Sequence, residues 1–284
     1  MSQLVDIHLD DILASITIPA SPAVLSQLND EIRCPVPNNG FIARMIGKDV
    51  GLSALVFKSV SVLLNPGQHP ESIREAIDML GLEMLGTLVT ESLRRSVVLT
   101  HDASLERFWD SSSHSARICA ELSGIIPGTT VERAHTFGLF RDCGIPIMIS
   151  RFPNYKTILA EANNTVDRSF TAVEDSYLNT NHAAIGYLMT RNWGLPKVIS
   201  SAVLCHHDYA VLLNDDLSFP QESRVLIAVA ALSDHIANQH LRSHDDAEWS
   251  KAKDNVCAYL GHSMLEIEDI TDDLLYRLDK FANS

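Results

Sequence analysis

Twelve histidines in this chain are accompanied by carboxylates at positions that could build a metal site. Imidazole and carboxylate groups together bind divalent first-row metals. Two such metals, bridged by one carboxylate, can hold a phosphate and lower the pKa of an attacking water molecule. The side chains that could form a site of this kind are His114, Asp142, His182, His206, His207 and Asp234.

The elements that must position these side chains are predicted to be helices. Apolar residues recur at helical spacing, as at Ile73, Ala76, Ile77 and Leu80, and no segment shows a convincing strand alternation. The expected placements are His114 on a helix over 105–122, Asp142 at the start of a short helix after a buried segment over 131–140, His182 at the start of another helix, His206 and His207 at the end of a helix over 197–207, and Asp234 inside an apolar helix over 225–237.

Spacing alone does not establish that these helices meet in one pocket. A single histidine on a helical face is more often a capped or solvated residue than a metal ligand. Asp234, in contrast, lies in an apolar stretch and therefore needs a partner. From the residue types by themselves, a metal centre and a set of unrelated polar side chains are both open interpretations.

Helix punctuation predicts an all-α fold of many short helices joined by tight loops. Ser21 followed by Pro22 is typical of a helix start, whereas Gly81 and Gly194 lie where helices should end. Turn-forming residues over 124–130 and 213–221 mark two seams in the chain.

We expect three helical parts that pack as one body. The first is a helical lobe that extends to about residue 100. The second is a helical lobe over about 101–212 that carries the histidines. The third is a helical extension over 213–284 that packs on the second lobe. Neither seam is long or biased enough to be a flexible linker.

Composition excludes some classes of partner. The chain of 284 residues is 46% hydrophobic, which is enough to bury a large core. It carries 22 Lys and Arg against 36 Asp and Glu, which gives a net charge of -14. This charge repels nucleic-acid backbones and anionic membranes. We therefore expect no nucleic-acid partner and no membrane partner.

Cysteine usage and the N-terminal sequence favour a cytoplasmic location. The five cysteines are scattered and form no Cys-x-x-Cys pair, as expected for small buried side chains in a reducing compartment. No basic region precedes an apolar stretch at the N-terminus, and the longest apolar run, over 225–232, is too short to span a bilayer.

Ordered motifs along the chain resemble the HDOD family, a helical relative of the HD and HD-GYP metal-dependent phosphohydrolases. The run over 72–82, Ser-Ile-Arg-Glu-Ala-Ile-Asp-Met-Leu-Gly-Leu, is the most specific. The resemblance covers about residues 14 to 210, and we assign an HDOD domain to 14–212. The other matching segments, in the order of the family, are 18–25, 46–52, Phe108-Trp109, 138–144, 182–186, 193–196 and His206-His207.

The resemblance implies an all-α HDOD fold with an HD-like lobe, in a family regarded as regulatory modules of bacterial signalling. The chain departs from the HD pattern in four places. Arg141 stands where the motif has histidine, and Ile145 stands where HD phosphohydrolases often have lysine. No Gly-Tyr-Pro element follows His207. If Trp109 fixes the register, Ser111 takes the place of the first ligand, with His114 one helical turn later.

Arg141 determines what the resemblance can mean chemically. A guanidinium does not lose its proton in a protein, so it cannot bind a metal, and its charge repels a cation placed beside it. The same group can pair with Asp142 and Asp234 and neutralise carboxylates that would otherwise be buried without compensation. We therefore expect Arg141 to replace one metal of the HD site.

The favoured interpretation is a non-catalytic signal-transduction module with a degenerate site at Arg141, Asp142 and Asp234. It needs no cofactor, acts on a signalling protein in trans or by self-association, and could take a small phosphate-containing ligand.

The alternative is a metal-dependent phosphohydrolase that acts on a nucleotide or another phosphoester. Its single ion of iron, manganese, zinc, nickel or magnesium would be held by Asp142, His182 and His206, the set to which the resemblance assigns the second metal. His207 lies nearby, and His207 or Asp234 would handle protons.

Overall fold

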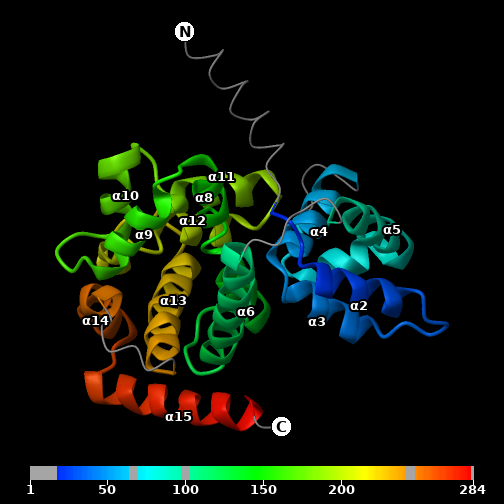
Figure 1. The fold of residues 1–284 in the computed structure, drawn as a ribbon. Helices are drawn as coiled ribbons and strands as arrows, with labels where there is room; N and C mark the ends of the chain where they lie inside the picture. Colours follow the sequence, from blue (N-terminus) through cyan, green and yellow to red (C-terminus); the bar gives the residue numbers. More distant parts are fainter. Residues whose placement is uncertain (1–17, 64–68, 97–102, 241–246, 283–284) are drawn as a thin grey trace.

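The computed structural model describes residues 18–63, 69–96, 103–240 and 247–282, and these residues fold into α-helices without a β-strand (Figure 1). The all-α prediction is confirmed. The first residues assigned to the HDOD domain, 14–17, lie outside the described part of the chain. None of the described helices is long and apolar enough to cross a membrane.

The first helical lobe lies to one side of the molecule in Figure 1 and consists of α2 (Pro22–Ile32), α3 (Asn39–Gly47), α4 (Val50–Leu63) and α5 (Ile73–Ser96). Helix α2 begins at Pro22 after its N-cap Ser21, as predicted. Gly81 interrupts α5 with a φ of 74°, a left-handed conformation that favours glycine. The predicted helix end at Gly81 is therefore a kink between two helical segments.

The second lobe contains the predicted histidine-bearing helices. It consists of α6 (Ala103–Ser123), α7 (Val131–Phe140), α8 (Ile145–Arg151), α9 (Tyr155–Asn164), α10 (Phe170–Leu178), α11 (His182–Asn192), α12 (Lys197–Cys205) and the short 3-10 helix η1 (Tyr209–Leu213). Helix α7 spans the segment over 131–140 that was expected to be buried, and its second half is buried. After α11, Gly194 takes a φ of 78°, which agrees with the predicted helix end.

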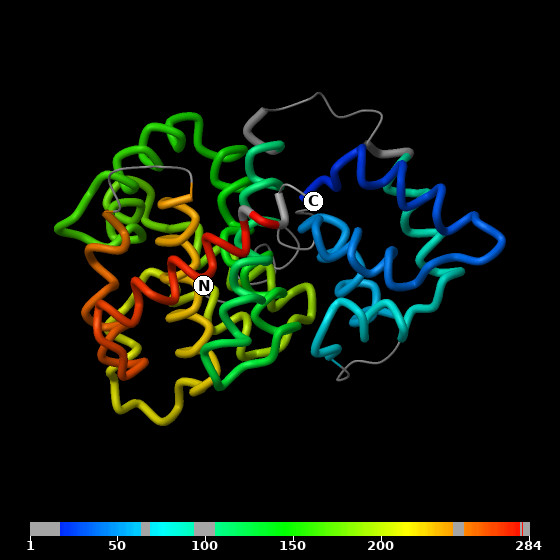
Figure 2. Tube along the Cα trace, turned by 90° about the horizontal axis from the view of Figure 1, so that it is seen from below, coloured from blue at the N-terminus to red at the C-terminus, as the bar shows by residue number. Residues whose placement is uncertain are grey.

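Helix α13 (Gln221–His240) is the central helix of the second lobe, where it packs against α6, α7 and α12 (Figure 1). Every residue from 223 to 233 is buried, which explains why the run over 225–232 is apolar on all sides of the helix. Helix α14 (Ala247–Leu260) packs on α13, η1 and α9. Seen from below in Figure 2, α15 (Met264–Ala282) runs across the end of the lobe, and it contacts α13.

Aromatic side chains join the two lobes beside the segment that carries Arg141. The ring of Phe140 lies 6.0 Å from that of Phe57 in α4 and 5.8 Å from that of Trp193. Trp109 Nε1 donates a hydrogen bond of 3.1 Å to the carbonyl of Pro19. Trp109 and Trp193 are thus packing residues.

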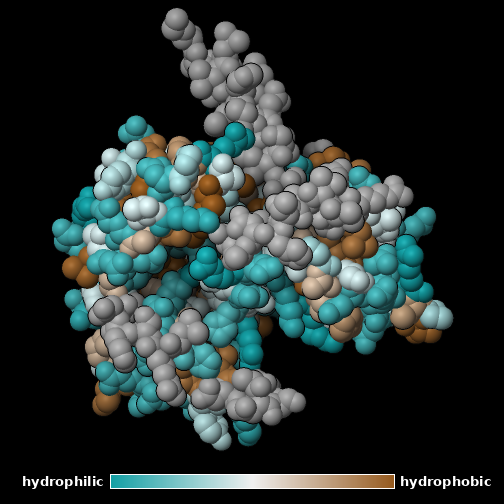
Figure 3. All heavy atoms as spheres, viewed as in Figure 1, coloured by the Kyte–Doolittle hydropathy of each residue, from teal (hydrophilic) through white to brown (hydrophobic). Residues whose placement is uncertain are grey.

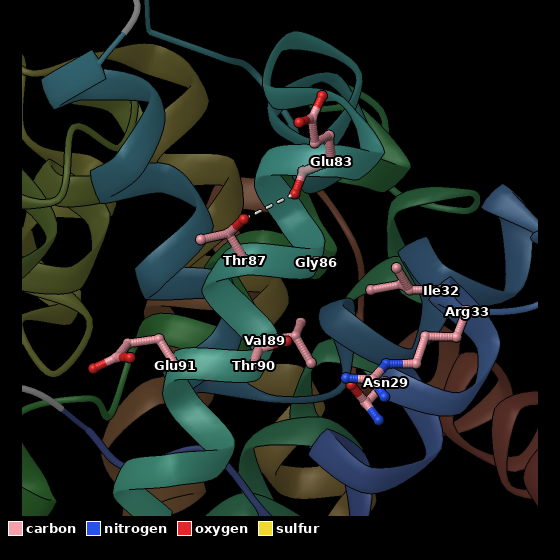
Figure 4. A pocket seen from close by; sticks show the side chains of 9 residues that line it. All are labelled: Asn29, Ile32, Arg33, Glu83, Gly86, Thr87, Val89, Thr90 and Glu91. Carbon is pink, nitrogen blue, oxygen red and sulfur yellow. Dashed lines mark hydrogen bonds between the residues drawn. The ribbon is translucent and has the colours of Figure 1, made fainter.

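A groove of about 500 Å³ lies in the first lobe, between α2 and α5 (Figure 4). The face shown in Figure 3 is mostly hydrophilic, with scattered hydrophobic residues. None of the described histidines lines the groove, so the groove is separate from the predicted metal ligands. Its lining consists of Asn29, Ile32, Arg33, Glu83, Gly86, Thr87, Val89, Thr90 and Glu91.

The side chain of Asp49 holds the start of α2 against the start of α4. It is 1% exposed, and its oxygens accept the backbone N–H of Ser21 at 2.6 Å and that of Leu52 at 2.9 Å. Both donors are among the N–H groups that a helix start leaves unpaired. One carboxylate therefore caps α4 and fixes the entry of the chain into α2.

Replacing Asp49 by alanine should lower the free energy of unfolding by about 2 kcal/mol or more, because two buried donors lose their acceptor. Urea denaturation followed by circular dichroism measures the change. Asp30→Ala, on an exposed position of α2, is the control and should shift stability by less than about 0.5 kcal/mol. Equal stability of the two variants would show that Asp49 does not cap these helices.

Candidate metal centre

Four of the six predicted side chains converge in the second lobe. Ligand atoms of Asp142, His182, His206 and His207 lie within 4.8 Å of one another. His182 is the first residue of α11, as predicted. A donor set of imidazoles with one carboxylate fits a single first-row metal ion such as zinc.

Two local predictions were wrong in detail. Asp142 does not begin a helix; it lies in the turn between α7 and α8, and α8 begins at Ile145. Helix α12 ends at Cys205, so His206 and His207 follow the helix instead of ending it. Asp142, His206 and His207 thus lie on turns and not within helices. On turns, their side chains can point toward one common position, which the geometry of a continuous helix would not allow.

Gly144 allows the turn that carries Asp142 to approach α11. A Cβ atom at this position would lie 2.1 Å from the carbonyl oxygen of His182, a distance that no side chain can tolerate. The two backbones are thus in direct contact. This contact places the carboxylate of Asp142 beside the imidazole of His182.

The Nε2 atoms of His182 and His206 point toward each other. His182 Nδ1 lies 2.7 Å from an oxygen of Glu174, and His206 Nδ1 lies 2.7 Å from the carbonyl of Val203. These partners only accept, so each Nδ1 carries a proton. The two Nε2 atoms are 3.2 Å apart and lie 3.6 Å and 3.3 Å from Oδ1 of Asp142. The lone pairs of the two Nε2 atoms and of Oδ1 point toward one another. They repel each other unless they share a proton or a cation.

Glu174 is a partner that the sequence analysis missed. It is fully buried on α10, and it accepts hydrogen bonds from His182 Nδ1 and from the hydroxyl of Tyr155. Burial and the charge of Glu174 raise the pKa of Tyr155. The signal in the sequence is that Glu174 falls on the apolar face that Phe170 and Val173 define, where a carboxylate needs a partner.

Glu248 on α14 is the second missed partner. Its Oε1 lies 2.7 Å from Nδ1 of His207 and 2.8 Å from the hydroxyl of Tyr209. The imidazole of His207 stacks on Phe170 at 4.7 Å. Burial and the nearby His206 lower the pKa of His207 to about 3, so this imidazole is neutral at pH 7.

Arg141 binds both carboxylates, which the sequence analysis expected. It is 7% exposed; Nη1 lies 2.7 Å from Oδ2 of Asp234, Nη2 binds the other oxygen of Asp234, and Nε lies 3.1 Å from Oδ2 of Asp142. Burial would raise the pKa of Asp142, but the guanidinium and the neighbouring His206 and His182 hold it well below its usual range. Asp142 therefore shares its two oxygens between Arg141 and the histidines.

The other two predicted side chains are not among the converging ligand atoms. His114 stacks on His240 at 6.0 Å, and its Nε2 is buried with no hydrogen-bond partner among the described residues. Burial, His240 and Arg117 lower the pKa of His114. Asp234 reaches the cluster through Arg141, to which both of its oxygens are bound.

A hollow of about 250 Å³ leads from the surface to His207. It is smaller than the groove between α2 and α5, but its lining includes His207 of the histidine cluster. A small ligand could approach the cluster here. The lining residues are Val166, Asp167, Arg168, Ser169, His207, Asp208, Tyr209, Ala210, Lys251 and Asn255.

The substitution Arg141→Met should destabilise the protein by about 3 kcal/mol, because it leaves the partly buried carboxylates of Asp142 and Asp234, which are 26% and 27% exposed, without their cation. Added manganese should recover part of the loss by replacing the missing charge. Chemical denaturation with and without the metal measures both effects. The control is Arg277→Met, which breaks an exposed pair with Asp273 and should cost less than about 1 kcal/mol. Equal losses in the two variants would contradict the structural role of Arg141.

The low pKa of His207 predicts an acid sensitivity. In the unfolded chain His207 takes up a proton near pH 6.5, whereas the folded protein resists protonation down to about pH 3. Stability should therefore fall as the pH decreases below 6.5, by about 1.4 kcal/mol per pH unit from this group.

His207→Gln lacks that titration and keeps a donor for Glu248. Its unfolding should therefore take up one proton fewer than that of the wild type, and its unfolding free energy should depend less steeply on pH. Denaturation between pH 4.5 and pH 7.5 in chelator measures the two slopes. Identical slopes would mean that His207 is protonated as easily in the folded protein as in the unfolded chain.

Known structures share this fold. The MmoQ response regulator from Methylococcus capsulatus str. Bath superposes with a TM-score of 0.65 at 17% identity, over 90% of this chain and 98% of that one. A virulence factor from Campylobacter jejuni subsp. jejuni superposes with a TM-score of 0.56 at 14% identity, over 92% of this chain and 97% of that one. At such identities the likeness concerns the fold alone.

No curated protein matches the sequence. The family model of the HDOD domain matches residues 18–209, which include Arg141 and the cluster ligands Asp142, His182, His206 and His207. Helices α13 and α14, with Asp234 and Glu248, follow the matched region. The match confirms the resemblance read from the motifs: this chain belongs to the HDOD family.

Proposed function

We propose that this chain is a regulatory module of bacterial signal transduction that does not hydrolyse phosphoesters. The observation that carries the proposal is the pairing of Arg141 with Asp142 and Asp234. This guanidinium holds the carboxylate oxygens that a first metal would need, and it cannot become a ligand itself. The likeness in fold to a protein named a response regulator supports a role in signalling.

The groups that the alternative would use to move protons are already engaged. Both oxygens of Asp234 accept from Arg141, and Nδ1 of His207 is bound to Glu248. The pKa of His207, lowered to about 3, is far from the value near neutrality that suits a general acid or base. The module acts on a signalling protein in trans or by self-association, and its net charge of -14 speaks against nucleic acid as a partner.

A single metal ion at the histidine cluster is compatible with this role. His182, His206 and His207 each have Nδ1 bound to an acceptor, which leaves Nε2 as the ligand nitrogen. Imidazole-rich sites suit zinc, iron or nickel better than magnesium, which prefers oxygen ligands. The same cluster is the observation that favours the second candidate, a phosphohydrolase with one metal, since a bound metal could activate water.

Metal content and phosphodiester turnover distinguish the two candidates. Protein purified without chelator or affinity metal should contain at most one metal ion per chain by elemental mass spectrometry, and His206→Ala should lose it. Bis(p-nitrophenyl) phosphate with added manganese or zinc should be hydrolysed no faster by the wild type than by His206→Ala. Turnover that His206→Ala abolishes would overturn the regulatory proposal and establish the phosphohydrolase.

A further inference from the structure

The acceptor that orients His207 comes from a helix outside the family-matched region. Glu174 and Val203, which orient His182 and His206, lie within residues 18–209, whereas Glu248 lies on α14. The chain separates His207 from Glu248 by 41 residues. The third imidazole is therefore oriented only when α14 is docked on the second lobe.

Glu248 is held as an ionised carboxylate at this position. Oε1 accepts from His207 and Tyr209, and Oε2 lies 2.5 Å from Nζ of Lys251. Burial would raise the pKa of Glu248, but the hydrogen bond from His207 and the ammonium of Lys251 lower it. An ionised carboxylate only accepts hydrogen bonds. The proton of neutral His207 therefore lies on Nδ1, and the lone pair lies on Nε2.

Packing around Glu248 connects the histidine cluster to the docking of α14. Trp249, the next residue, stacks on His235 of α13 with ring centroids 4.5 Å apart. Ala252 and Val256 are fully buried on the same helix. Lys251 also donates to the carbonyl of Arg168 at 3.3 Å. The residues that anchor α14 thus flank the one that orients His207.

We propose that Glu248 is the positioning residue of the cluster and that it links metal binding to the docking of α14. Metal binding at Nε2 makes the Nδ1 proton of an imidazole more acidic, which strengthens its hydrogen bond to a carboxylate. A metal ion therefore favours docked α14, and docked α14 favours the metal by the same free energy. This inference rests on the single-metal capacity proposed above, and it makes α14 the element that reports the state of the cluster.

Glu248→Gln tests the orientation of His207 without changing the size of the side chain. The amide oxygen replaces Oε1, because this position accepts from both His207 and Tyr209, whereas Lys251 keeps the carbonyl of Arg168 as an acceptor. A neutral amide oxygen is a weaker acceptor than a carboxylate oxygen, so the hydrogen bond from Nδ1 of His207 weakens. Long-range ¹H–¹⁵N NMR should show Nδ1–H for His207 in the wild type, with its proton signal farther downfield than in the variant.

Zinc affinity and hydrogen exchange test the linkage. In competition with a zinc-binding dye, Glu248→Gln should bind zinc about 10- to 100-fold more weakly than the wild type. Zinc should slow amide exchange over residues 247–260 in the wild type and have little effect there in the variant. The matched control is Asp254→Asn, an exposed position on α14 with the same change of charge, which should behave as the wild type.

Three results would overturn the inference: an Nε2–H tautomer of His207 in the wild type, wild-type zinc affinity in Glu248→Gln, or a wild type that does not bind zinc. None of these results concerns turnover of phosphodiesters, which decides the regulatory proposal. Wild-type protein that hydrolyses the substrate would overturn that proposal and leave the role of Glu248 intact.

Discussion

The arrangement of the site depends on the ion pairs that the buried guanidinium of Arg141 forms with two carboxylates. The guanidinium joins the turn between α7 and α8 to the central helix α13, because its ion pairs reach Asp142 on one and Asp234 on the other. Two carboxylates at this depth would repel each other without a cation between them. Arg141 therefore supplies the positive charge that these carboxylates need, and it fixes the oxygen of Asp142 that faces the histidines.

The histidine cluster beside this ion pair is organised by the protein before any ligand arrives. Acceptors from α10, α12 and α14 hold the imidazoles of His182, His206 and His207 in one tautomer each. Such outer partners fix the direction of the ligand lone pairs and raise their basicity. The site thus combines a carboxylate pair bound to Arg141 with a cluster of imidazoles whose Nδ1 atoms are bound to acceptors, an arrangement that supports the proposed regulatory function.

Lobe packing and site geometry share one segment of the chain. Phe140 contacts Phe57 of the first lobe and Trp193 of the second, and the next residue is Arg141. At the opposite side of the cluster, His207 is bound to α14 through Glu248. The cluster is therefore connected both to the contact of the two lobes and to a helix outside the family-matched region.

The amino-acid order alone predicts the all-α fold, the backbone breaks at Gly81 and Gly194, and the need of Arg141 for carboxylate partners. These features follow from periodicity, capping and charge over a few neighbouring residues, and the ordered HDOD motifs identified the cluster ligands. The three-dimensional arrangement was needed to show that Asp142 lies on a turn against Gly144, that His114 is not among the converging ligand atoms, and that Glu174 and Glu248 orient the imidazoles. Those contacts depend on which helix faces meet in space, and a pair such as His207 and Glu248, 41 residues apart, leaves no local pattern in the sequence.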